Sequence, residues 1–454
     1  MKNKNKKIAI CHYRVGGTDG VSLEIKKRKQ ILESCGCEVK LIAGSRSEKA
    51  DYMIEELEWE DNAISIIKRN GFVKFNGKDF DNLELADKIL KVSEIIEKKL
   101  DEIQEKEQFD CVLIHNIFCF GGHIAAARSF YHFIEKYQLQ TIATHHDFFW
   151  ERKDFRVPRS DLIKDFVETY LPPDNFLIKH VVLSSITKRE LKKRRGIDSD
   201  ILPDIFDFSQ DRWVKDKYNS DLLEKIDVKE SDLFVLQATR IVPRKGIEIA
   251  VDFVEALEKK MKGLVGETLY NGKKITLDSK LVLVLAGYYE DSNKDYFLKI
   301  KELAREKNIE FRFIKDLINS KRSFHNSKKI YSLWDVYTYA DIITFPSIWE
   351  GWGNQFIEAV FAGKPVVVWE YPVFKADIKP EGYKVISLGD KIIERGYDDL
   401  WQVSDNNLKH AVDETEEWIT DENLIKTLEE NFKIGEINHG FSIVEEFLKK
   451  ELNI

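Results

Sequence analysis

The 454-residue chain has little glycine, proline or cysteine. Its 23 glycines and 9 prolines are too few for a collagen-like or Pro/Gly-rich low-complexity protein. The five cysteines are an odd number in a long chain and include no CxxC pair. This pattern argues against a disulfide scaffold and favours reduced thiols in a cytoplasmic protein.

The sequence also lacks long hydrophobic runs and an excess of positive charge. No stretch approaches about 18 apolar residues, so no transmembrane helix is expected. The apolar run after the basic N-terminus is too short for a signal peptide. With 71 basic and 79 acidic residues the net charge is −8, whereas proteins that bind nucleic acid or anionic membranes are usually basic. These absences argue against nucleic-acid and membrane partners and leave room for a local anion site.

What the chain does contain is a regular alternation of short apolar runs and helical patterns. Its length predicts two or three domains, at about 100–200 residues each. In the first half the runs are brief, β-branched and bounded by polar residues, which indicates buried parallel strands. These strands are predicted at 7–13, 37–44, 109–116, 140–147 and 180–185, with helices at 20–34, 81–106 and 122–136. Such alternation is typical of a doubly wound α/β domain.

The same alternation begins again after a charged segment at 205–231. A second set of strands is predicted at 232–239, 280–287, 310–314, 341–346, 364–369 and 383–388, with helices at 246–262, 293–308, 326–340 and 353–362. Residues 263–279 are predicted to form an exposed insertion, with a hairpin around Asn271-Gly272. The fold class is therefore predicted as α/β, with two Rossmann-like domains that face each other across a ligand-binding cleft.

A basic turn follows the first strand of the second half. Arg240 and Lys245 stand in RIVPRKG, directly after the apolar run, and Gly246 opens the next predicted helix. An arginine fork, a lysine point charge and the free N–H groups of a helix N-terminus together suit a diphosphate. A solvated basic turn explains the same residues, so this motif alone leaves both interpretations open.

A glycine-rich turn with two carboxylates is more specific. In PSIWEGWGNQFIEA a strand runs into Gly351 and Gly353 and then into a helix, while Glu350 and Glu358 stand eight residues apart. A fully helical segment separates the two carboxylates by about 12 Å along its axis. That span is comparable to the distance between the sugar and the ribose of a nucleotide sugar. The glycines and the apolar neighbours favour a positioned, buried helix over a surface helix with two solvated glutamates.

Together, Arg240, Lys245 and the Glu350-x7-Glu358 pair resemble the retaining glycosyltransferases of family 4, which have the GT-B fold. The resemblance extends to LVLVLAG, to AGKPVVVW and to the terminal NFKIGEINHGFSIVEEFL. In the first half it rests on a glycine loop, on FDCVLIHN and on a His-Asp pair after the fourth strand. It implies an acceptor-side domain over 1–207, a nucleotide-sugar domain over 208–440, and a final helix, 441–454, that packs back on the first domain.

The resemblance also implies roles for the charged residues of the second half. Arg240 and Lys245 would neutralise the donor diphosphate as it leaves. Glu350 would bind hydroxyls of the transferred sugar, and Glu358 those of the ribose. No carboxylate stands out as a nucleophile for double displacement, so the implied reaction is a front-face substitution in which the leaving phosphate helps to take the acceptor proton. No metal or other cofactor is required.

Glycines and their neighbours would supply backbone contacts in the same scheme. Gly353 and Asn354 would contact phosphate or sugar through their N–H groups. Gly16 and Gly17, in the loop after the first strand, would meet the donor phosphate or the acceptor from the first domain.

The acceptor side is the least specific part of the resemblance. His146 is similar to the histidine that lies beside the transferred sugar, and His145 is the competing choice. The basic segment that follows contains Arg152, Lys153 and Arg156. It is predicted either to contact an anionic acceptor or to form a solvated surface loop.

The sequence therefore predicts a metal-independent retaining hexosyltransferase. It would move glucose or mannose from a nucleotide sugar of the UDP-glucose or GDP-mannose type to a small hydroxyl acceptor, such as a sugar phosphate or a glycerate glycoside. Three alternatives stay open: a nucleotide-sugar epimerase of the same fold, a lipid or polysaccharide glycosyltransferase, and a non-catalytic nucleotide-sugar-binding protein.

Overall fold

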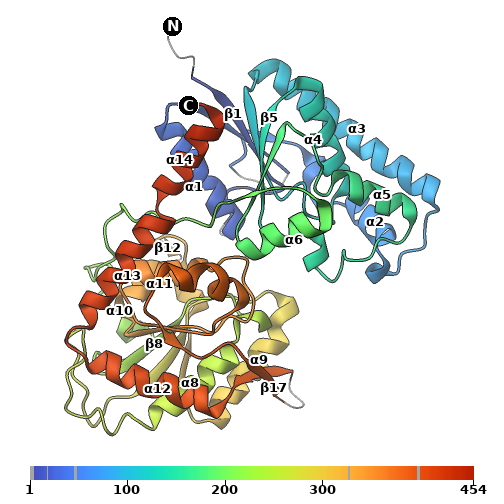
Figure 1. Ribbon diagram of the computed structural model, residues 1–454. Coiled ribbons are helices and arrows are strands. Elements are labelled where there is room, and N and C mark those ends of the chain that lie inside the picture. The colour runs from blue at the N-terminus through green and yellow to red at the C-terminus, as the bar shows by residue number, and fades with distance from the viewer. Residues whose placement is uncertain (1–4, 18, 45–48, 326–327, 396–398) are drawn as a thin grey trace. The chain divides into compact units, whose positions relative to one another are not determined.

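The computed structural model describes residues 5–454 except Thr18, 45–48, 326–327 and 396–398. It divides into two compact units, one formed by Met1–Ile205 with Phe441–Ile454 and the other by Phe206–Gly440. Each unit contains one large parallel sheet with helices on both faces (Figure 1). The predicted α/β class is confirmed for both halves of the chain. Among the described helices, none combines the length and the apolar character that a membrane span needs.

The first unit is built on a seven-stranded sheet in the order β3-β2-β1-β4-β5-β6-β7. Its strands are β1 (Lys7–Cys11), β2 (Glu38–Ala43), β3 (Tyr52–Met53), β4 (Cys111–His115), β5 (Gln140–His145), β6 (Ile178–Val182) and β7 (Asp200–Ile201). Neighbouring strands pair in parallel throughout. All carboxyl ends therefore lie at one edge of the sheet, where the connecting loops gather.

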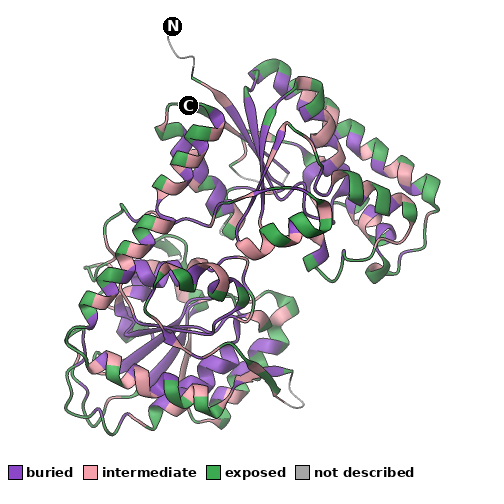
Figure 2. Ribbon diagram, viewed as in Figure 1, coloured by how far each residue is buried: buried purple, intermediate pink, exposed green. Residues whose placement is uncertain are grey.

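The helices of the first unit cover both faces of this sheet. They are α1 (Gly20–Ser34), α2 (Asn62–Gly71), α3 (Asn82–Glu107), α4 (Ile124–Tyr137), α5 (Asp161–Tyr170) and α6 (Ser185–Arg195). Successive strand residues point to opposite faces. Ile8 and Ile10 accordingly join a core cluster with residues of α1, whereas Ala9 and Cys11 join a cluster with residues of α2, α3, α4 and α5. Figure 2 shows the strands as buried and the outer helix surfaces as exposed.

The final helix, α14 (Phe441–Leu452), belongs to the first unit. Val444, Leu448 and Leu452 are buried at intervals of four residues, which places them on one face of the helix. They lie in the same cluster as Ile31 and Leu32 of α1. The end of the chain thus completes the core on one face of the first sheet.

The second unit repeats the architecture with a six-stranded sheet in the order β10-β9-β8-β14-β15-β16. Its strands are β8 (Leu233–Gln237), β9 (Leu281–Leu285), β10 (Glu310–Phe313), β14 (Ile342–Phe345), β15 (Val366–Val368) and β16 (Ile386–Ser387). The helices are α7 (Leu222–Lys225), α8 (Ile247–Glu258), α9 (Lys294–Glu306), α10 (Leu333–Tyr339), α11 (Asn354–Phe361), α12 (Asp405–Thr420) and α13 (Leu424–His439). Smaller strands are β11 (Ile318–Asn319), β12 (Ser323–His325), β13 (Lys328–Ser332), β17 (Ile392–Arg395) and β18 (Leu400–Val403).

The helix predicted over 326–340 is wrong in its first part. Lys328–Ser332 forms β13, which pairs with β11 and β12, and 326–327 lie outside the described residues. The helix begins only at Leu333 because Ser332 and Asp335 form a capping box, in which each side chain accepts the other's backbone N–H.

The exposed insertion predicted at 263–279 is confirmed for most of its residues, which are exposed, although a few apolar side chains of the segment are not. Leu269, Tyr270 and Ile275 are buried. The Asn271 amide and the Lys273 ammonium both donate to the Asp341 carboxylate, at 2.6 and 2.5 Å. The predicted hairpin around Asn271-Gly272 is confirmed, since Thr268 and Lys274 form an antiparallel bridge and the Leu269 N–H donates to the Lys273 carbonyl at 2.8 Å. Side-chain contacts to the start of β14 therefore hold this segment against the sheet.

The packing of α14 predicts that Leu448→Ala destabilises the first unit by about 2–5 kcal/mol. Leu448 is only 2% exposed, so its truncation leaves a cavity. Denaturant unfolding, with hydrogen exchange to assign the transition to this unit, measures the effect. Leu83→Ala on α3 is the control, because Leu83 is 82% exposed and its loss should cost less than about 0.5 kcal/mol. Equal costs for the two substitutions would contradict the packing of α14.

Candidate active site

Two loops meet at the carboxyl edge of the second sheet. They leave β8 and β14, which are hydrogen-bonded neighbours. The Ile348 N–H donates to the Arg244 carbonyl at 2.8 Å, and the Gln237 side-chain amide donates to the Lys245 carbonyl at 3.1 Å. The basic turn after β8 is therefore held directly against the turn that leads into α11.

Glycine permits this close approach. Gly246 has φ +57°, and a Cβ atom there would stand 2.4 Å from the Pro346 carbonyl oxygen. Any other residue would push the two loops apart and would also be strained in this backbone conformation. The glycine that ends RIVPRKG is thus required by the contact between the loops.

A buried ion pair joins the two loops. The Lys245 ammonium donates to Glu350 Oε1 and, at 3.2 Å, to Gln355 Oε1. Arg244 donates to Glu350 Oε2 at 2.7 Å. Lys245 is 3% exposed and Glu350 7% exposed. The structure thereby brings together Lys245 and Glu350, two of the residues singled out from the sequence.

Arg244 is a member of this network that the sequence analysis did not single out. It stands next to Lys245 in RIVPRKG, and its guanidinium also donates to the Trp349 carbonyl at 2.9 Å. The only signal in the sequence was its position in the basic turn. Arg240, by contrast, is exposed and lies 3.6 Å from Glu290. It contributes charge to the turn without joining the Glu350 network.

The electrostatics of the pair follow from burial and from the neighbouring charges. Burial lowers the pKa of Lys245, while the Glu350 carboxylate opposes that effect. Burial raises the pKa of Glu350, but the Lys245 and Arg244 cations outweigh it, so this pKa lies below its usual value. Glu350 is therefore ionised and held by two cations.

The start of α8 differs from the expectation of a free helix N-terminus. The Ile247 N–H donates to the Tyr296 hydroxyl at 3.1 Å, and that hydroxyl donates to Glu248. The first N–H of this helix is thus already satisfied by a side chain. An anion at this turn would be bound chiefly by the cationic side chains rather than by this amide.

The start of α11 lies beside the ion pair. Gly353 precedes Asn354, the first residue of the helix, and no side chain caps it. Glu358 lies on the helix and accepts a hydrogen bond of 3.0 Å from the Tyr337 hydroxyl. Because Glu350 precedes the helix, the helical spacing of the two carboxylates expected from the sequence is wrong.

Gly353 occupies a backbone conformation that only glycine adopts readily. Its φ is +140°, and a Cβ atom there would stand 2.3 Å from the Tyr371 hydroxyl oxygen. That hydroxyl donates to the Trp352 carbonyl at 2.5 Å. Tyr371 thus fixes the turn that aims the first amides of α11.

The glycine loop of the first unit lies between β1 and α1. Gly16 and Gly17 are exposed, and Gly16 has φ +80°. Asp19 ends the loop, because its carboxylate accepts the Ser22 N–H at 3.0 Å and caps α1. The loop is therefore anchored where it enters α1, and its two glycines are exposed.

The two candidate histidines differ in their surroundings. His145 is 1% exposed, and its Nε2 lies 2.9 Å from Nδ1 of His180. His146 is half-buried. Its ring Nε2 lies 3.3 Å from Nδ1 of His115, and its backbone N–H donates to the Asn116 side-chain oxygen at 2.9 Å. Of the two residues, His146 is the one that is partly exposed.

His146 belongs to a group of neutral histidines at the carboxyl edge of the first sheet. Burial lowers its pKa to about 3, with a further lowering from Arg28 and His12. Burial likewise lowers the pKa of His12 to about 4. At neutral pH the His146 ring can therefore donate one hydrogen bond and accept another, and it carries no charge.

The basic segment after β5 is exposed in Arg152, Lys153 and Arg156. Arg152 Nε donates to Asp147 at 2.6 Å, and Arg156 Nε donates to the Trp150 carbonyl at 3.1 Å. Arg152 is thus tied to the residue that follows His146, whereas Arg156 is tied to the backbone of its own segment. Within the described residues, no group of His, Cys, Asp and Glu side chains is arranged to hold a metal ion.

Comparison with known protein families matches residues 219–433 to the family described as glycosyl transferases group 1. Two curated proteins are similar over most of the chain, and both are called mannosylglucosylglycerate synthase. The one from Petrotoga mobilis is 41% identical over 408 residues, 90% of this chain and 92% of its own length. The one from Thermotoga maritima is 34% identical over 449 residues, 98% of this chain and 99% of its own length.

Solved structures match at low sequence identity. A glycosyltransferase from Rickettsia africae matches with a TM-score of 0.62 at 15% identity, covering 99% of both chains. The sucrose-phosphate synthase of Thermosynechococcus elongatus matches with a TM-score of 0.60 at 13% identity, covering 99% of this chain and 98% of its own. At these identities the likeness shows the fold alone. The fold is GT-B, as predicted from the sequence.

The geometry at Gly353 predicts that Gly353→Ala destabilises the second unit by at least about 1–3 kcal/mol, through backbone strain and the clash with Tyr371. Thermal unfolding measures the effect. Adding Tyr371→Phe to the Ala variant removes the clashing oxygen and should recover part of the loss, while the strain at φ +140° remains. An Ala variant as stable as the original would contradict the described turn.

The buried histidines predict that the first unit loses stability below about pH 6.5. Burial lowers the pKa of His180 to about 4, so below the ordinary value near 6.5 the unfolded chain takes up a proton that the folded chain excludes. The loss is about 1.4 kcal/mol per pH unit for one such group, and it continues down to about pH 4.

The measurement is the free energy of unfolding between pH 7 and pH 5. His180→Gln should lower the number of protons taken up on unfolding by about one, so its free energy of unfolding should depend less steeply on pH. His410→Gln, at a histidine whose side chain is 75% exposed, should leave that dependence unchanged. The burial argument fails if the His180 and His410 variants have the same pH dependence.

Proposed function

Because the chain belongs to the glycosyl transferases of group 1, we propose that it transfers a mannosyl group from a nucleotide sugar to glucosylglycerate. The observation that carries the proposal is the similarity to two mannosylglucosylglycerate synthases over at least 90% of this chain. The product in that name contains a mannose joined to a glucosylglycerate. A glycosyltransferase that makes it by one transfer uses a glycerate glycoside as its acceptor, as expected from the sequence.

The donor is bound by the second unit in this proposal. Lys245 and Arg244 bind the diphosphate from one side, and Arg240 adds a more exposed cation. The first amides of α11, at Asn354 and Gln355, approach it from the other side, where a helix N-terminus favours an anion. Support comes from the contact of the two loops and from the absence of a side-chain cap on α11.

Glu350 is assigned to the hydroxyls of the mannose. Two cations already hold this carboxylate, which makes it a poor nucleophile and a well-oriented hydrogen-bond acceptor. We therefore favour a front-face substitution with retention of configuration. The acceptor oxygen forms the new bond to the anomeric carbon, the bond from that carbon to the diphosphate breaks, and the acceptor proton passes to the leaving phosphate.

The protein's contribution to this step is electrostatic. The leaving diphosphate gains negative charge as the bond breaks, and a buried cation that is already in place stabilises that charge without reorganisation. Lys245, Arg244 and Arg240 supply the positive charge that a metal ion supplies in other enzymes, so the proposed reaction is metal-independent. The neutral His146 ring is assigned to a hydroxyl of the transferred sugar.

The proposal is tested by following UDP-glucose and GDP-mannose by NMR, with and without glucosylglycerate. We expect one nucleoside diphosphate released per new glycosidic bond, from the mannose donor, with the anomeric configuration of mannose retained. Epimerised nucleotide sugar without acceptor would instead identify an epimerase. Donor consumption with a lipid or a polysaccharide, and none with glucosylglycerate, would assign another acceptor. Five free thiols support placing the reaction in the cytoplasm.

The ribose assignment of Glu358 yields a separate prediction. Glu358→Gln should weaken nucleoside diphosphate binding about tenfold or more, since a hydrogen bond to a charged group contributes about 1.5–3 kcal/mol. Calorimetry with the ribonucleotide and its 2′,3′-dideoxy analogue measures this. The analogue should bind the original protein and the variant equally.

Glu422→Gln is the matched control, because Glu422 is an exposed glutamate of the same unit. Its variant should bind both nucleotides like the original protein. An unchanged ribonucleotide affinity in Glu358→Gln would remove the ribose assignment.

A further inference from the structure

The carboxyl edge of the first sheet carries a group of aromatic and arginine side chains that the donor site does not use. It consists of Tyr13 and Arg14 after β1, Trp59 after the short helix η1 (Glu55–Leu57), Phe120 after β4, and Arg152 after the short helix η3 (Phe149–Glu151). We call this group the aromatic–arginine cluster. Four separate segments of the chain contribute to it.

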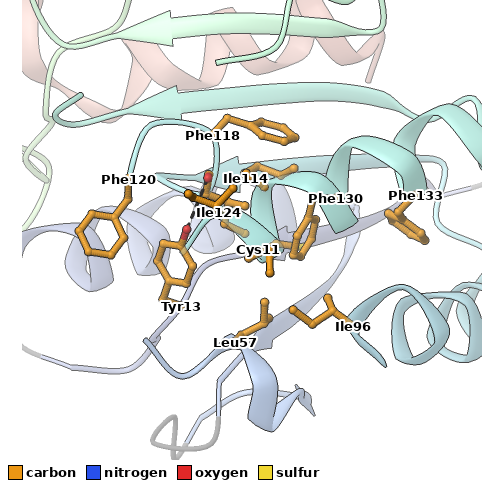
Figure 3. Packing of buried hydrophobic residues seen from close by; sticks show 14 of the residues in the cluster. Cys11, Tyr13, Leu57, Ile96, Ile114, Phe118, Phe120, Ile124, Phe130 and Phe133 are labelled. Carbon is orange, nitrogen blue, oxygen red and sulfur yellow. Dashed lines mark hydrogen bonds between the residues drawn. The ribbon is translucent and has the colours of Figure 1, made fainter. Parts of the chain in front are cut away.

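The aromatic rings of the cluster form a continuous base. The Trp59 and Phe120 ring centroids are 5.2 Å apart, and Tyr13 lies 5.9 Å from Trp59 and 5.7 Å from Phe120. Figure 3 shows Tyr13 and Phe120 side by side at the margin of the hydrophobic core, with the Tyr13 hydroxyl bonded to a backbone carbonyl. The core thus fixes these rings from behind.

Each arginine lies over one of the rings. The Arg14 guanidinium is 5.1 Å from the Trp59 centroid, and the Arg152 guanidinium is 5.1 Å from the Phe120 centroid. A cation–π contact orients a guanidinium without using its N–H donors. Two long, flexible side chains are therefore held in place while most of their hydrogen-bonding capacity remains.

Among the described residues, the two arginines have few carboxylate partners. No described carboxylate lies within 4.0 Å of the Arg14 guanidinium. Arg152 uses its Nε on Asp147, which leaves its two Nη groups, and its side chain is 44% exposed. The cluster thus offers planar N–H forks of the kind that match a carboxylate.

The position of the cluster connects it to the proposed reaction. Arg152 is bonded to Asp147, the neighbour of His146, and Arg14 lies in the same loop after β1 as Gly16 and Gly17. We propose that Arg14 and Arg152 bind the carboxylate of the acceptor and that Trp59 and Phe120 hold the two guanidinium groups for it. The inference rests on the proposed function and names the part of the acceptor site that distinguishes an acid from a neutral glycoside.

The same geometry separates Arg152 from its basic neighbours. Arg156 is bonded to a backbone carbonyl of its own segment, and neither it nor Lys153 stacks on a ring of the cluster in the contacts described. The number of cations in the segment is therefore not what recognises the acceptor. Recognition of the acceptor carboxylate is assigned to Arg152 of this segment and to Arg14 of the loop after β1.

The test compares glucosylglycerate with glucosylglycerol, in which a CH₂OH group replaces the carboxylate. Transfer rates and calorimetric affinities are measured for the original protein and for Arg14→Met, Arg152→Met and the double variant. Each single substitution should lower kcat/KM for glucosylglycerate about tenfold or more, as expected for loss of a charged hydrogen bond. The value for glucosylglycerol should change less than about threefold. Arg14→Lys keeps the charge and loses the fork, so its kcat/KM for glucosylglycerate should lie between those of the original protein and Arg14→Met.

Arg305→Met is the matched control, because Arg305 is exposed on α9 and pairs with Glu302 on the surface. This variant should keep the original preference for the carboxylate. The neutral acceptor also serves as an internal check on folding, since a misfolded variant loses activity with both acceptors.

Two outcomes would overturn the inference. One is a carboxylate preference that persists in the double variant, and the other is an equal loss for both acceptors in variants that keep their unfolding temperature. A failure of the proposed function looks different. In that case the original protein binds glucosylglycerate in an arginine-dependent way and transfers nothing to it.

Discussion

The buried contact between Lys245 and Glu350 is the interaction on which the rest of the second unit's site depends. Taking an ammonium and a carboxylate out of water costs several kcal/mol for each ion, which their mutual attraction offsets only when the geometry is good. The structure meets that demand by holding two loops together through Gly246 and the Gln237 amide. A buried charge pair of this kind is weak evidence for stability and better evidence for a site that needs a fixed cation.

The ion pair also explains why Glu350 is suited to binding hydroxyls. Arg244 and Lys245 hold Glu350 ionised and oriented, which favours hydroxyl binding over nucleophilic attack. The first unit presents the complementary chemistry, with neutral histidines near a pair of ring-stacked arginines. Charge is thus concentrated where a diphosphate and a carboxylate are proposed to bind, in a protein whose net charge is −8.

Local patterns predicted much of this structure, and contacts between distant segments account for the errors. Buried parallel strands read as continuous apolar runs, so the main strands were recognisable, and motif spacing singled out Lys245 and Glu350. The prediction of a helix at 326–340 missed β13, because this strand is stabilised by pairing with β11 and β12 and not by a pattern in its own residues. Arg244 and Trp59 carry no periodic signal. Their importance arises from side chains that the fold brings to them across long stretches of chain.

The central claim is that Lys245 acts on the departing diphosphate and does more than neutralise Glu350. The most direct measurement is a double-mutant cycle on kcat, with Lys245→Met, Glu350→Gln and the double variant. If the claim holds, Lys245→Met still lowers kcat at least about a hundredfold in the Glu350→Gln background, the scale of a lost transition-state charge contact. Equal kcat values for Glu350→Gln and the double variant, both folded, would contradict it.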